Sequence, residues 1–462
     1  MDRHANQTSG PGRPRTAALG ELARTRYPLE RATLANGLRV LLAPDRTVPV
    51  VAVTVYCDVG MRSEPQGRTG FAHLFEHLMF QGSENLPKLD HFRYVQSAGG
   101  TFNGRTHLDY TQYYDVLPSN ALERALYLEA DRMRAPALNE ENLRLQIEVV
   151  KEEIRVNVRN KPYGCFPWLT LPGVLFRTFP NAHDGYGSFE DLDAATVDDA
   201  YQFFDRYYAP CNLLVCIGGD FDPAQAATLA ERYFGAIPYR PAPVRPDFAE
   251  PALTGERRVT LHDPHAPLPA VASGWRVPDP VRDWDSYLPF LLLTKVMSDG
   301  KASRLYRRLV HEDRTAASQR CHLGFLGDPF DVGHPTAMVF TARQSSDGPA
   351  DIVLDAVGEE FARLAVDGFA ERELRRATAR ITTRLLREAD PILGRTQAMA
   401  AMELRHGRAE LIAELPDLLA GVTEEQVRAA AATIAGAGRG VVALRPARED
   451  SGDSGDGRAA RP

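Results

Sequence analysis

The chain has 462 residues, of which 44% are hydrophobic and 25% are charged, and its formal net charge is −7. These values are those of a soluble globular protein with two or three domains. The acidic balance gives no reason to expect nucleic acid or an anionic membrane surface as a partner. No apolar run reaches the roughly 18 residues that a membrane-spanning helix needs.

The cysteines and the N-terminal residues indicate a cellular compartment. Five cysteines form no Cys-x-x-Cys pair and most lie among apolar neighbours, so we expect buried thiols in a reducing compartment. The first 27 residues lack the apolar segment of a secretory signal and resemble a mitochondrial presequence poorly. We therefore expect a cytoplasmic protein.

The first part of the chain reads as a tail followed by strands and helices. Residues 1–27 are rich in Gly and Pro, and we expect a flexible tail there. Asn36-Gly37 is a turn signal before a strand, and Thr196 with Asp199 fits a helix N-cap. Besides a helix that begins near residue 71, we expect strands at 38–42, 50–57, 99–106, 110–117 and 211–217 and helices at 119–134, 139–160 and 196–208.

The second part of the chain repeats the first. Five prolines between residues 238 and 251 cannot lie in a helix or a central strand, so we expect a linker at 239–256. Beyond it the same order of elements returns, with strands at 257–261, 269–275 and 440–444 and helices at 286–298, 350–366 and 370–389. We predict an α+β fold of two homologous domains in tandem, at 28–238 and 257–447, before a tail at 448–462.

The strongest chemical signal is the stretch His73-Leu-Phe-Glu-His77. On an α-helix, residues four apart lie on one face, one turn apart. Two imidazoles so placed can bind one zinc ion, and Glu76 can act as general base on a water beside the metal. The alternative interpretation is a pair of histidines on a helix surface. Only 12 histidines occur in the chain, so a chance match is rare.

The repeat favours metal binding, and not a packing requirement of the fold, as the reason for this motif. Aligning the two copies on Gly82 and Gly300 places Leu291, Thr294 and Lys295 where the first copy has His73, Glu76 and His77. A packing requirement of the fold should recur in both copies. The polar triplet does not recur, so we predict a metal site in the first copy alone.

A catalytic zinc ion usually has three protein ligands and one open position, so the motif needs a third ligand. The acidic helix around residues 140–155 is the expected source. Glu148 and Glu152 lie roughly opposite its apolar stripe, whereas Glu153 lies on the border of that stripe, where a carboxylate can reach inward. Glu153 is our first choice and Glu148 the second.

These residues together resemble the insulinase/pitrilysin family of zinc peptidases, from about residue 30 to 447. The resemblance is carried by His73-Leu-Phe-Glu-His77, Val149-Val-Lys-Glu-Glu-Ile-Arg155, Gly99-Gly-Thr-Phe-Asn-Gly-Arg-Thr106, Asn160-Lys-Pro-Tyr-Gly164 and Tyr207-Tyr-Ala-Pro-Cys-Asn212. It implies one zinc ion per chain, held by His73, His77 and Glu153, and it places Asn103 beside the site. It also implies that a chain of this length is half of a clam-shaped chamber.

Two positions depart from the family pattern. Gln146 stands where the family often has a second glutamate, so it can hydrogen-bond a metal ligand but adds no charge. In complete relatives the second half supplies an arginine and a tyrosine that contact the substrate. Arg304 preserves the arginine, but the expected place of the tyrosine, near Ala317, has none. We therefore expect a related partner subunit that supplies an Arg/Tyr pair, with a homodimer as the second option.

The expected function is a zinc-dependent endopeptidase that hydrolyses short peptides or unfolded segments, with Glu76 moving the proton. Two alternatives remain open. One is a maturation peptidase that trims a leader from one dedicated peptide. The other is a scaffold subunit that keeps the fold without catalysis. A lyase with the same inverted motif resembles a much shorter chain, so the length argues against it.

Overall fold

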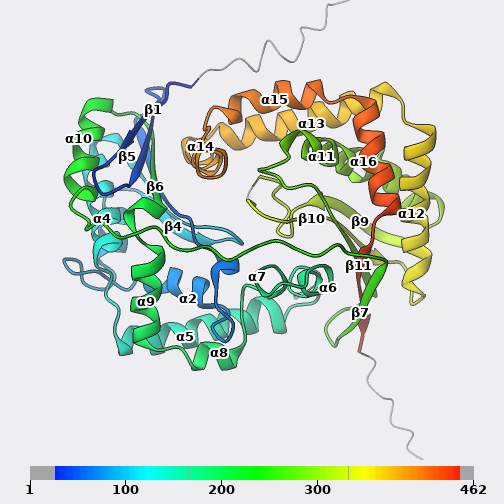
Figure 1. The fold of residues 1–462 in the computed structure, drawn as a ribbon, viewed down its shortest axis with the longest axis horizontal. Coiled ribbons are helices and arrows are strands. Elements are labelled where there is room, and N and C mark those ends of the chain that lie inside the picture. Colours follow the sequence, from blue (N-terminus) through cyan, green and yellow to red (C-terminus); the bar gives the residue numbers. More distant parts are fainter. Residues whose placement is uncertain (1–26, 165, 331, 448–462) are drawn as a thin grey trace, which may run out of the picture.

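The computed structural model describes residues 27–164, 166–330 and 332–447. The predicted tails, apart from residue 27, lie outside the described residues. Two β-sheets, each with helices of its own, form the left and right parts of the molecule (Figure 1). The boundaries predicted for the two domains stay a prediction.

The two sheets have the same strand order. The first sheet consists of β1 (Glu30–Thr33), β2 (Arg39–Pro44), β3 (Val50–Cys57), β4 (Thr101–Thr106), β5 (Thr111–Pro118) and β6 (Leu213–Gly219). The second consists of β7 (Glu256–Asp263), β8 (Ala270–Arg276), β9 (Ala316–Leu323), β10 (Ala337–Gln344) and β11 (Arg439–Pro446). Their orders are β1-β2-β6-β3-β5-β4 and β7-β11-β8-β10-β9.

Apart from β1, the two orders agree strand by strand. The β2–β6 and β7–β11 pairs are parallel, and the other pairs of this common core are antiparallel. The prediction of two homologous α+β copies is therefore confirmed.

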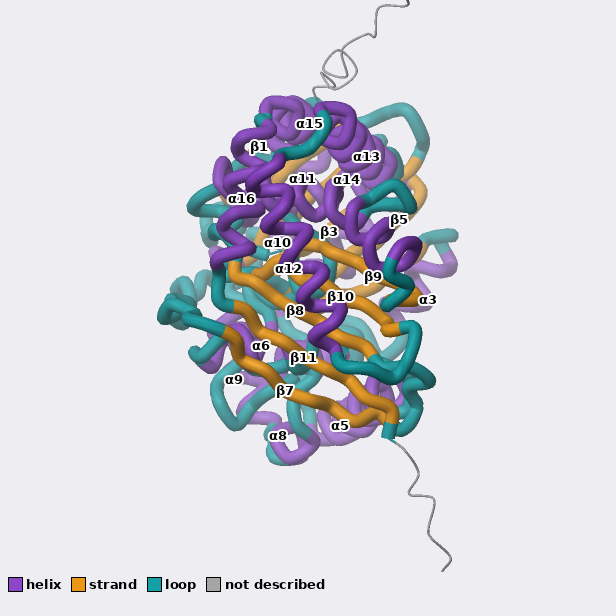
Figure 2. The backbone as a smooth tube through the Cα atoms, turned by 90° about the vertical axis from the view of Figure 1, so that its right-hand side faces the viewer, coloured by secondary structure: helices purple, strands orange, loops and turns teal. Residues whose placement is uncertain are grey.

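Helices cover one face of each sheet. The first copy contains α2 (Phe71–Leu78), α3 (Asp90–Ser97), α4 (Leu122–Arg134), α5 (Glu140–Ile154), α6 (Leu171–Leu175), α7 (Phe179–Ala182), α8 (Phe189–Asp193), α9 (Val197–Tyr207) and α10 (Pro223–Phe234). The second contains α11 (Trp284–Ser298), α12 (Ala350–Asp367), α13 (Glu371–Ala389), α14 (Ile392–His406), α15 (Leu411–Gly421) and α16 (Glu424–Gly436). Figure 2 shows α12 and α16 lying in front of the second sheet.

Most predicted elements are present, with shifted ends. The capping box of Thr196 and Asp199 opens α9 as predicted. The strand expected at 211–217 begins only at Leu213, because Pro210–Asn212 form a 3-10 turn. The helix expected at 139–160 ends at Ile154 and continues as a π-helical turn, Arg155–Arg159.

Each sheet is covered on its other face by a helix from the opposite copy. From the second copy, α14 packs on β3 and β6 through Met399, Ala400 and Leu404. From the first copy, α6 packs on β8 and β11 through Leu171 and Leu175. The two copies therefore complete each other's apolar cores.

The segment between the copies is held in place. Residues 235–255 contain no helix or strand and run across the molecule from one copy to the other (Figure 1). The predicted linker at 239–256 falls in this segment except for its last residue. Arg245 pairs with Asp58, and the Phe248 ring stacks on His334 with centroids 3.9 Å apart. These contacts join the segment to both copies.

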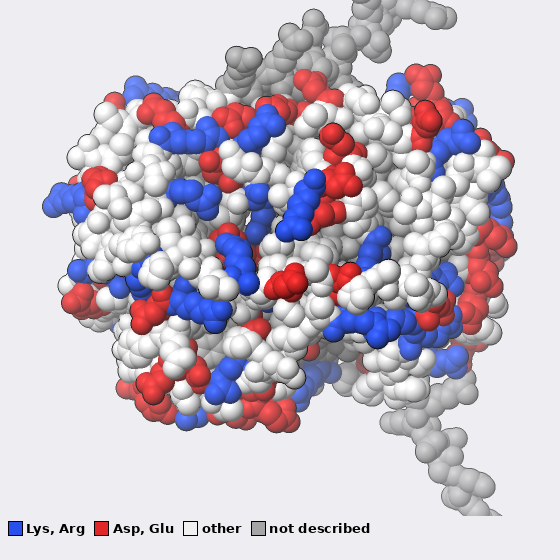
Figure 3. Space-filling view, viewed as in Figure 1, with Lys and Arg blue, Asp and Glu red and all other residues white. Residues whose placement is uncertain are grey.

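The surface and the thiols agree with a folded globular chain. Acidic and basic side chains are interspersed over the face in Figure 3. The four cysteines within the described ranges are free, and three of them are buried. Within those same ranges, no helix has both the length and the apolar character that crossing a bilayer requires.

Candidate metal centre

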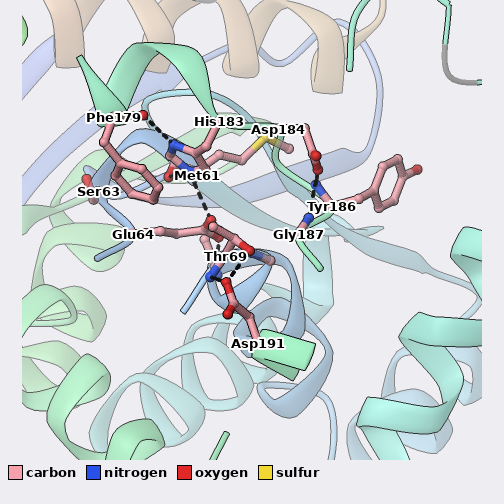
Figure 4. Close-up of polar contacts among 12 residues, drawn as sticks. Met61, Ser63, Glu64, Thr69, Phe179, His183, Asp184, Tyr186, Gly187 and Asp191 are labelled. Atoms are coloured by element: carbon pink, nitrogen blue, oxygen red, sulfur yellow. Dashed lines mark hydrogen bonds and ion pairs between the residues drawn. The ribbon is translucent and has the colours of Figure 1, made fainter. Parts of the chain in front are cut away.

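The helix with the two histidines begins at a carboxylate cap. Glu64 is 2% exposed and accepts hydrogen bonds from the backbone N–H groups of Gly70 (2.9 Å) and Ala72 (2.7 Å). A carboxylate at this end satisfies amides that have no partner within the helix and complements the helix dipole. His183 lies 3.1 Å from Glu64 on the other side, as Figure 4 shows. The start of α2 is thus fixed by buried, titratable groups.

One face of α2 packs in the core of the first copy. The buried residues are Phe71, Ala72, Leu74, Phe75 and Leu78. His73, Glu76 and His77 lie on the remaining face and are partly exposed. The spacing of apolar residues therefore forces the polar triplet to one side, as helical periodicity predicts.

Glu153 lies at the same place, near the end of α5. Its Oε2 atom is 3.7 Å from Nε2 of His73 and 3.5 Å from Nε2 of His77. The candidate ligand atoms of these three residues all lie within 4.8 Å of one another. The structure therefore brings together the three ligands that the sequence predicts.

The charges of His73 and Glu153 suit a zinc ion. Burial and the neighbouring His77 lower the pKa of His73 to about 4, so its imidazole is neutral at pH 7. The hydrogen bond with His77 lowers the pKa of Glu153, which is therefore ionised. Burial lowers the pKa of His77, but Glu153 and Glu76 outweigh that effect and raise it. Two imidazole nitrogens and one carboxylate oxygen are a common ligand set of catalytic zinc.

Gln146 contacts one of the histidines. Its Oε1 atom is 3.3 Å from Nδ1 of His77 and can accept the Nδ1 proton, while Nε2 faces Glu153. A hydrogen bond of this kind fixes the ring orientation and tautomer of a metal-binding histidine. Gln146 therefore occupies the position beside the ligands that the sequence predicts for it.

Glu76 points toward the edge strand β4. Its Oε2 atom accepts a 2.6 Å hydrogen bond from the hydroxyl of Thr106. A Cβ atom on Gly104 would lie 2.9 Å from Oε1 of Glu76, so only glycine leaves room for the carboxylate in this position. Burial raises the pKa of Glu76, against the lowering effect of the Thr106 hydrogen bond. A raised pKa suits a group that must accept and return a proton.

The other predicted site residues lie elsewhere. Asn103 is exposed on β4, where its side chain accepts a hydrogen bond from the N–H of Gly104 (2.9 Å). Arg304 forms an ion pair with Glu373 (3.1 Å). The substrate-binding roles expected for Asn103 and Arg304 stay predictions. Glu148, the second choice for the third ligand, is exposed and pairs with a lysine.

Two residues of this region were not predicted. Thr106 lies in the segment 99–106, and strand alternation places it on the same face as Gly104. Tyr186 lies in a loop with no periodic pattern, and its ring centroid is 5.4 Å from that of His73. No sequence signal would have placed it there.

The equivalent positions of the second copy hold no such group. Leu291 and Thr294 are buried, and the Thr294 hydroxyl donates to the Leu291 carbonyl (2.7 Å). Lys295 and Leu291 line a cavity of about 350 Å³ between the two copies. Over the described residues, neither of the two groups with metal-binding geometry includes these positions. Among the described residues, the candidate metal-binding geometry therefore lies in the first copy, and a metal site there stays a prediction.

A second cluster, His91, Asp115 and Glu129, also has ligand atoms within 4.8 Å of one another. His91 and Asp115 hydrogen-bond each other at 3.0 Å, and the buried guanidinium of Arg132 pairs with Glu129. The Arg132 guanidinium therefore already supplies a positive charge to this cluster. We interpret it as a buried ion-pair network that supports β5 and α4.

Two segments of the chain match models of one protein family. Residues 39–165 match the model described as "Insulinase (Peptidase family M16)". Residues 194–381 match the model described as "Peptidase M16 inactive domain". The helix with His73 and His77 lies within the first match.

Similar proteins include several with the name of zinc protease. "Zinc protease PqqE" of Helicobacter pylori is 29% identical over 63% of this chain and 66% of its own length. A Mycobacterium leprae protein, named as an uncharacterized zinc protease, is 26% identical over 90% of this chain and 91% of its own. The human cytochrome b-c1 complex subunit 1 is 26% identical over 54% of this chain and 52% of its own.

Solved structures share the fold. The crystal structure of a protease from Helicobacter pylori superposes with a TM-score of 0.82 over 91% of this chain and 100% of that chain, at 23% identity. The first half of the Escherichia coli periplasmic protease PqqL superposes with a TM-score of 0.72 over 90% and 91%. Sequence models, relatives and fold all agree, and the chain belongs to the insulinase family of peptidases, family M16.

Proposed function

We propose that this protein is a zinc-dependent endopeptidase. The observation that carries the proposal is the convergence of His73, His77 and Glu153, from two helices, with Glu76 on the same face of α2. The names of the related zinc proteases support it. The proposed substrates are peptides or unfolded segments, because a folded protein does not present its backbone in an extended form.

The proposed roles follow from the positions of the side chains. His73, His77 and Glu153 would hold the metal, which would polarise the scissile carbonyl and acidify a water. Glu76 accepts the proton of that water and returns it to the leaving amine. Thr106 holds the Glu76 carboxylate through the 2.6 Å hydrogen bond, and Gln146 holds the ring of His77. Glu76 and His77 thus each have a defined hydrogen-bond partner.

The edge strand β4 is the proposed binding place for the substrate backbone. In the first sheet β4 pairs with β5 on one side only, so its other edge can accept an added strand. Gly104 and Thr106 of this strand touch or approach Glu76. A peptide paired with β4 would therefore have its backbone close to the general base. Asn103, exposed on the same strand, is a proposed contact.

A second unit of the same fold is the proposed partner. The complete PqqL chain superposes on this chain over only 47% of its length, so it has room for two units of this size. In this protein the Arg304 side chain is engaged by Glu373, and β9 carries no tyrosine at the expected position near Ala317. We propose that a related subunit, or a second copy of this chain, supplies the missing substrate contacts.

The test combines metal analysis with peptide cleavage by the full chain. The E76Q variant should retain about one zinc ion per chain and lose cleavage of unstructured peptides by a factor of about 100 or more. The H77A variant should lose both zinc and cleavage. As a matched control, E148Q changes an exposed glutamate of α5 and should behave as wild type. Undiminished cleavage by E76Q would contradict the proposal.

The two alternatives give different results in the same assays. A scaffold subunit, which the similarity to the cytochrome b-c1 subunit suggests, would bind no stoichiometric zinc and show no chelator-sensitive hydrolysis. A dedicated maturation peptidase would cleave one precursor at a single position and leave a random peptide library intact. The complete ligand set favours the peptidase over the scaffold.

A further inference from the structure

The loop between α7 and α8 carries an aromatic side chain to the metal centre. The ring of Tyr186 is 5.4 Å from that of His73, edge to face at 81°. On its other side, Tyr186 packs against Trp168 with centroids 5.3 Å apart. Its hydroxyl lies beside the carboxylate of Glu153 and, after His77, helps to lower the pKa of that carboxyl. One side chain therefore touches two of the three candidate ligands.

The backbone of this loop has little freedom. The Oδ1 atom of Asp184 accepts hydrogen bonds from the N–H groups of Tyr186 (3.0 Å) and Gly187 (2.8 Å), which closes a tight turn (Figure 4). Gly187 has φ +74°, and a Cβ atom there would lie 2.2 Å from the carbonyl oxygen of Thr69. A Cβ atom on Gly70 would lie 2.3 Å from the carbonyl oxygen of Tyr186. The turn can therefore lie against the start of α2 only because both positions are glycine.

The same loop is joined to α2 by side-chain hydrogen bonds. Thr69 donates through its N–H (3.0 Å) and its hydroxyl (2.5 Å) to Asp191, and it accepts from the N–H of Ser188 (3.1 Å). His183, at the beginning of the loop, contacts the helix cap Glu64. Because these contacts join the loop to the helix start, the Tyr186 ring moves with the helix that carries the histidines.

Glu153 needs a neighbouring group that fixes its side chain more than the two histidines do. Its side chain is 30% exposed, whereas those of His73 and His77 are 13% and 21% exposed. It lies one residue before the end of α5, next to the π-helical turn. A flexible carboxylate at a helix end would occupy several rotamers unless another group held it. The Tyr186 hydroxyl is in position to do so.

We propose that Tyr186 is a positioning residue of the metal centre, whose hydroxyl orients Glu153 toward the metal while its ring holds His73 in place. This inference rests on the proposed zinc site. Metal-binding carboxylates are generally hydrogen-bonded by outer groups, and removing such a group typically weakens metal affinity 10- to 100-fold. The motif itself contains no residue that hydrogen-bonds Glu153 from outside, because the Gln146 side chain contacts His77.

The test uses the full chain and measures zinc affinity by competition with a chelator. Y186F keeps the ring against His73 and Trp168 and removes only the hydroxyl, and we expect about 10-fold weaker zinc binding. The visible spectrum of the Co²⁺-substituted protein should also change, because it reports ligand geometry. Y201F is the matched control, since the Tyr201 hydroxyl donates to the Leu138 carbonyl (3.0 Å) away from the metal. It should leave both readouts unchanged.

The outcomes separate this inference from the proposed function. If wild type binds no zinc, the proposed function fails, and the inference fails with it. If wild type binds zinc and Y186F matches it in affinity and spectrum, only the inference is overturned. A metal-free Y186F that unfolds at a lower temperature than metal-free wild type would also overturn it, because the tyrosine would then act on the fold and not on the ligand. Weaker binding with unchanged metal-free unfolding supports it.

Discussion

At the scale of single residues, the space beside Glu76 is set by a glycine. Gly104 faces the Glu76 carboxylate from β4, and a Cβ atom there would approach Oε1 to 2.9 Å and the Phe80 ring to 3.0 Å. The nearest obstacle is the end of a flexible side chain, so the fold can accommodate a methyl group by moving the carboxylate. The general base would then leave its present position.

We therefore predict that G104A folds and binds zinc but cleaves peptides about 100-fold more slowly, since a displacement of about 1 Å can cost that much. Peptide cleavage, zinc content and thermal unfolding of the full chain check this. G348A is a suitable control, because a Cβ atom on Gly348 meets nothing within 4 Å. Full activity of G104A would show that catalysis tolerates a displaced Glu76.

The convergence of the three candidate ligands was predictable because it depends on helical periodicity. His73 and His77 repeat at one helical turn, and the apolar stripe of α5 places Glu153 on its inner border, which is where the structure has it. Thr106 and Tyr186 were not predicted. Their positions depend on which strand and which loop pass the helix, and those are tertiary facts that local spacing does not contain.

At the scale of elements, α2 depends on a buried pair of titratable groups at its start. Burial lowers the pKa of His183, but the hydrogen bond to Glu64 and the backbone carbonyls of Phe179 and Met61 raise it above its usual value. A histidine whose pKa is higher in the folded state stabilises the fold fully below its unfolded pKa of about 6.5. That contribution is lost as the pH rises through the folded pKa.

We predict that the loss of unfolding free energy in H183Q is largest near pH 6 and shrinks as the pH rises. The change amounts to about 1.4 kcal/mol for each unit by which the pKa is raised. Denaturant titrations of wild type and variant across that range measure it. F361L removes a ring that packs on Trp275, away from His183, and should cost the same free energy at every pH. A pH-independent loss in H183Q would contradict the role of the charged pair.

The ends of elements were harder to predict than their existence. The strand expected from Cys211 starts later because Pro210 opens a 3-10 turn. The expected long helix at 139–160 changes to a π-helical turn at Arg155. Both deviations lie where one element passes into the next, and there the backbone follows its tertiary neighbours more than its own propensity.

At the scale of the whole molecule, a buried ion pair joins the two copies. Arg62 and Asp109 pair at 3.2 Å with side chains 2% and 1% exposed. Arg62 also donates to the carbonyl of Pro335 (2.6 Å), and Asp109 accepts from the N–H of Gly333 (2.9 Å). Burial raises the pKa of Asp109, but Arg62 and Arg405 outweigh it and keep the carboxylate ionised. The pair is therefore a charged contact in the interface between the copies.

We predict that D109N loses about 3–5 kcal/mol of unfolding free energy, because it leaves the Arg62 guanidinium buried without a counter-charge. D351N breaks the exposed pair with Arg258 and should cost less than about 1 kcal/mol. Denaturant-induced unfolding compares the two variants. An equal loss of unfolding free energy in D109N and D351N would mean that the buried Arg62–Asp109 pair stabilises the fold no more than an exposed pair does.

The tandem repeat was predictable from the order of elements, and the exchange of covering helices was not. Leu171 and Leu175 of α6 look like residues of any small apolar helix, and so do Met399 and Ala400 of α14. Only the structure tells that each pair of residues belongs to the core of the opposite copy. The sheet on which a helix packs is set by contacts between residues far apart in the chain. The periodicity of apolar residues contains no information about those contacts.

A ribosome completes the first sheet long before it makes the helix that covers it. β6 ends at Gly219, whereas α14 begins at Ile392. At about 5–20 residues per second, roughly 9 to 35 seconds of synthesis separate them. During that time the face formed by Leu41, Tyr56 and Leu214 has no covering helix. The nascent chain should therefore be a client of chaperones that bind apolar segments, and chains interrupted before α14 should aggregate.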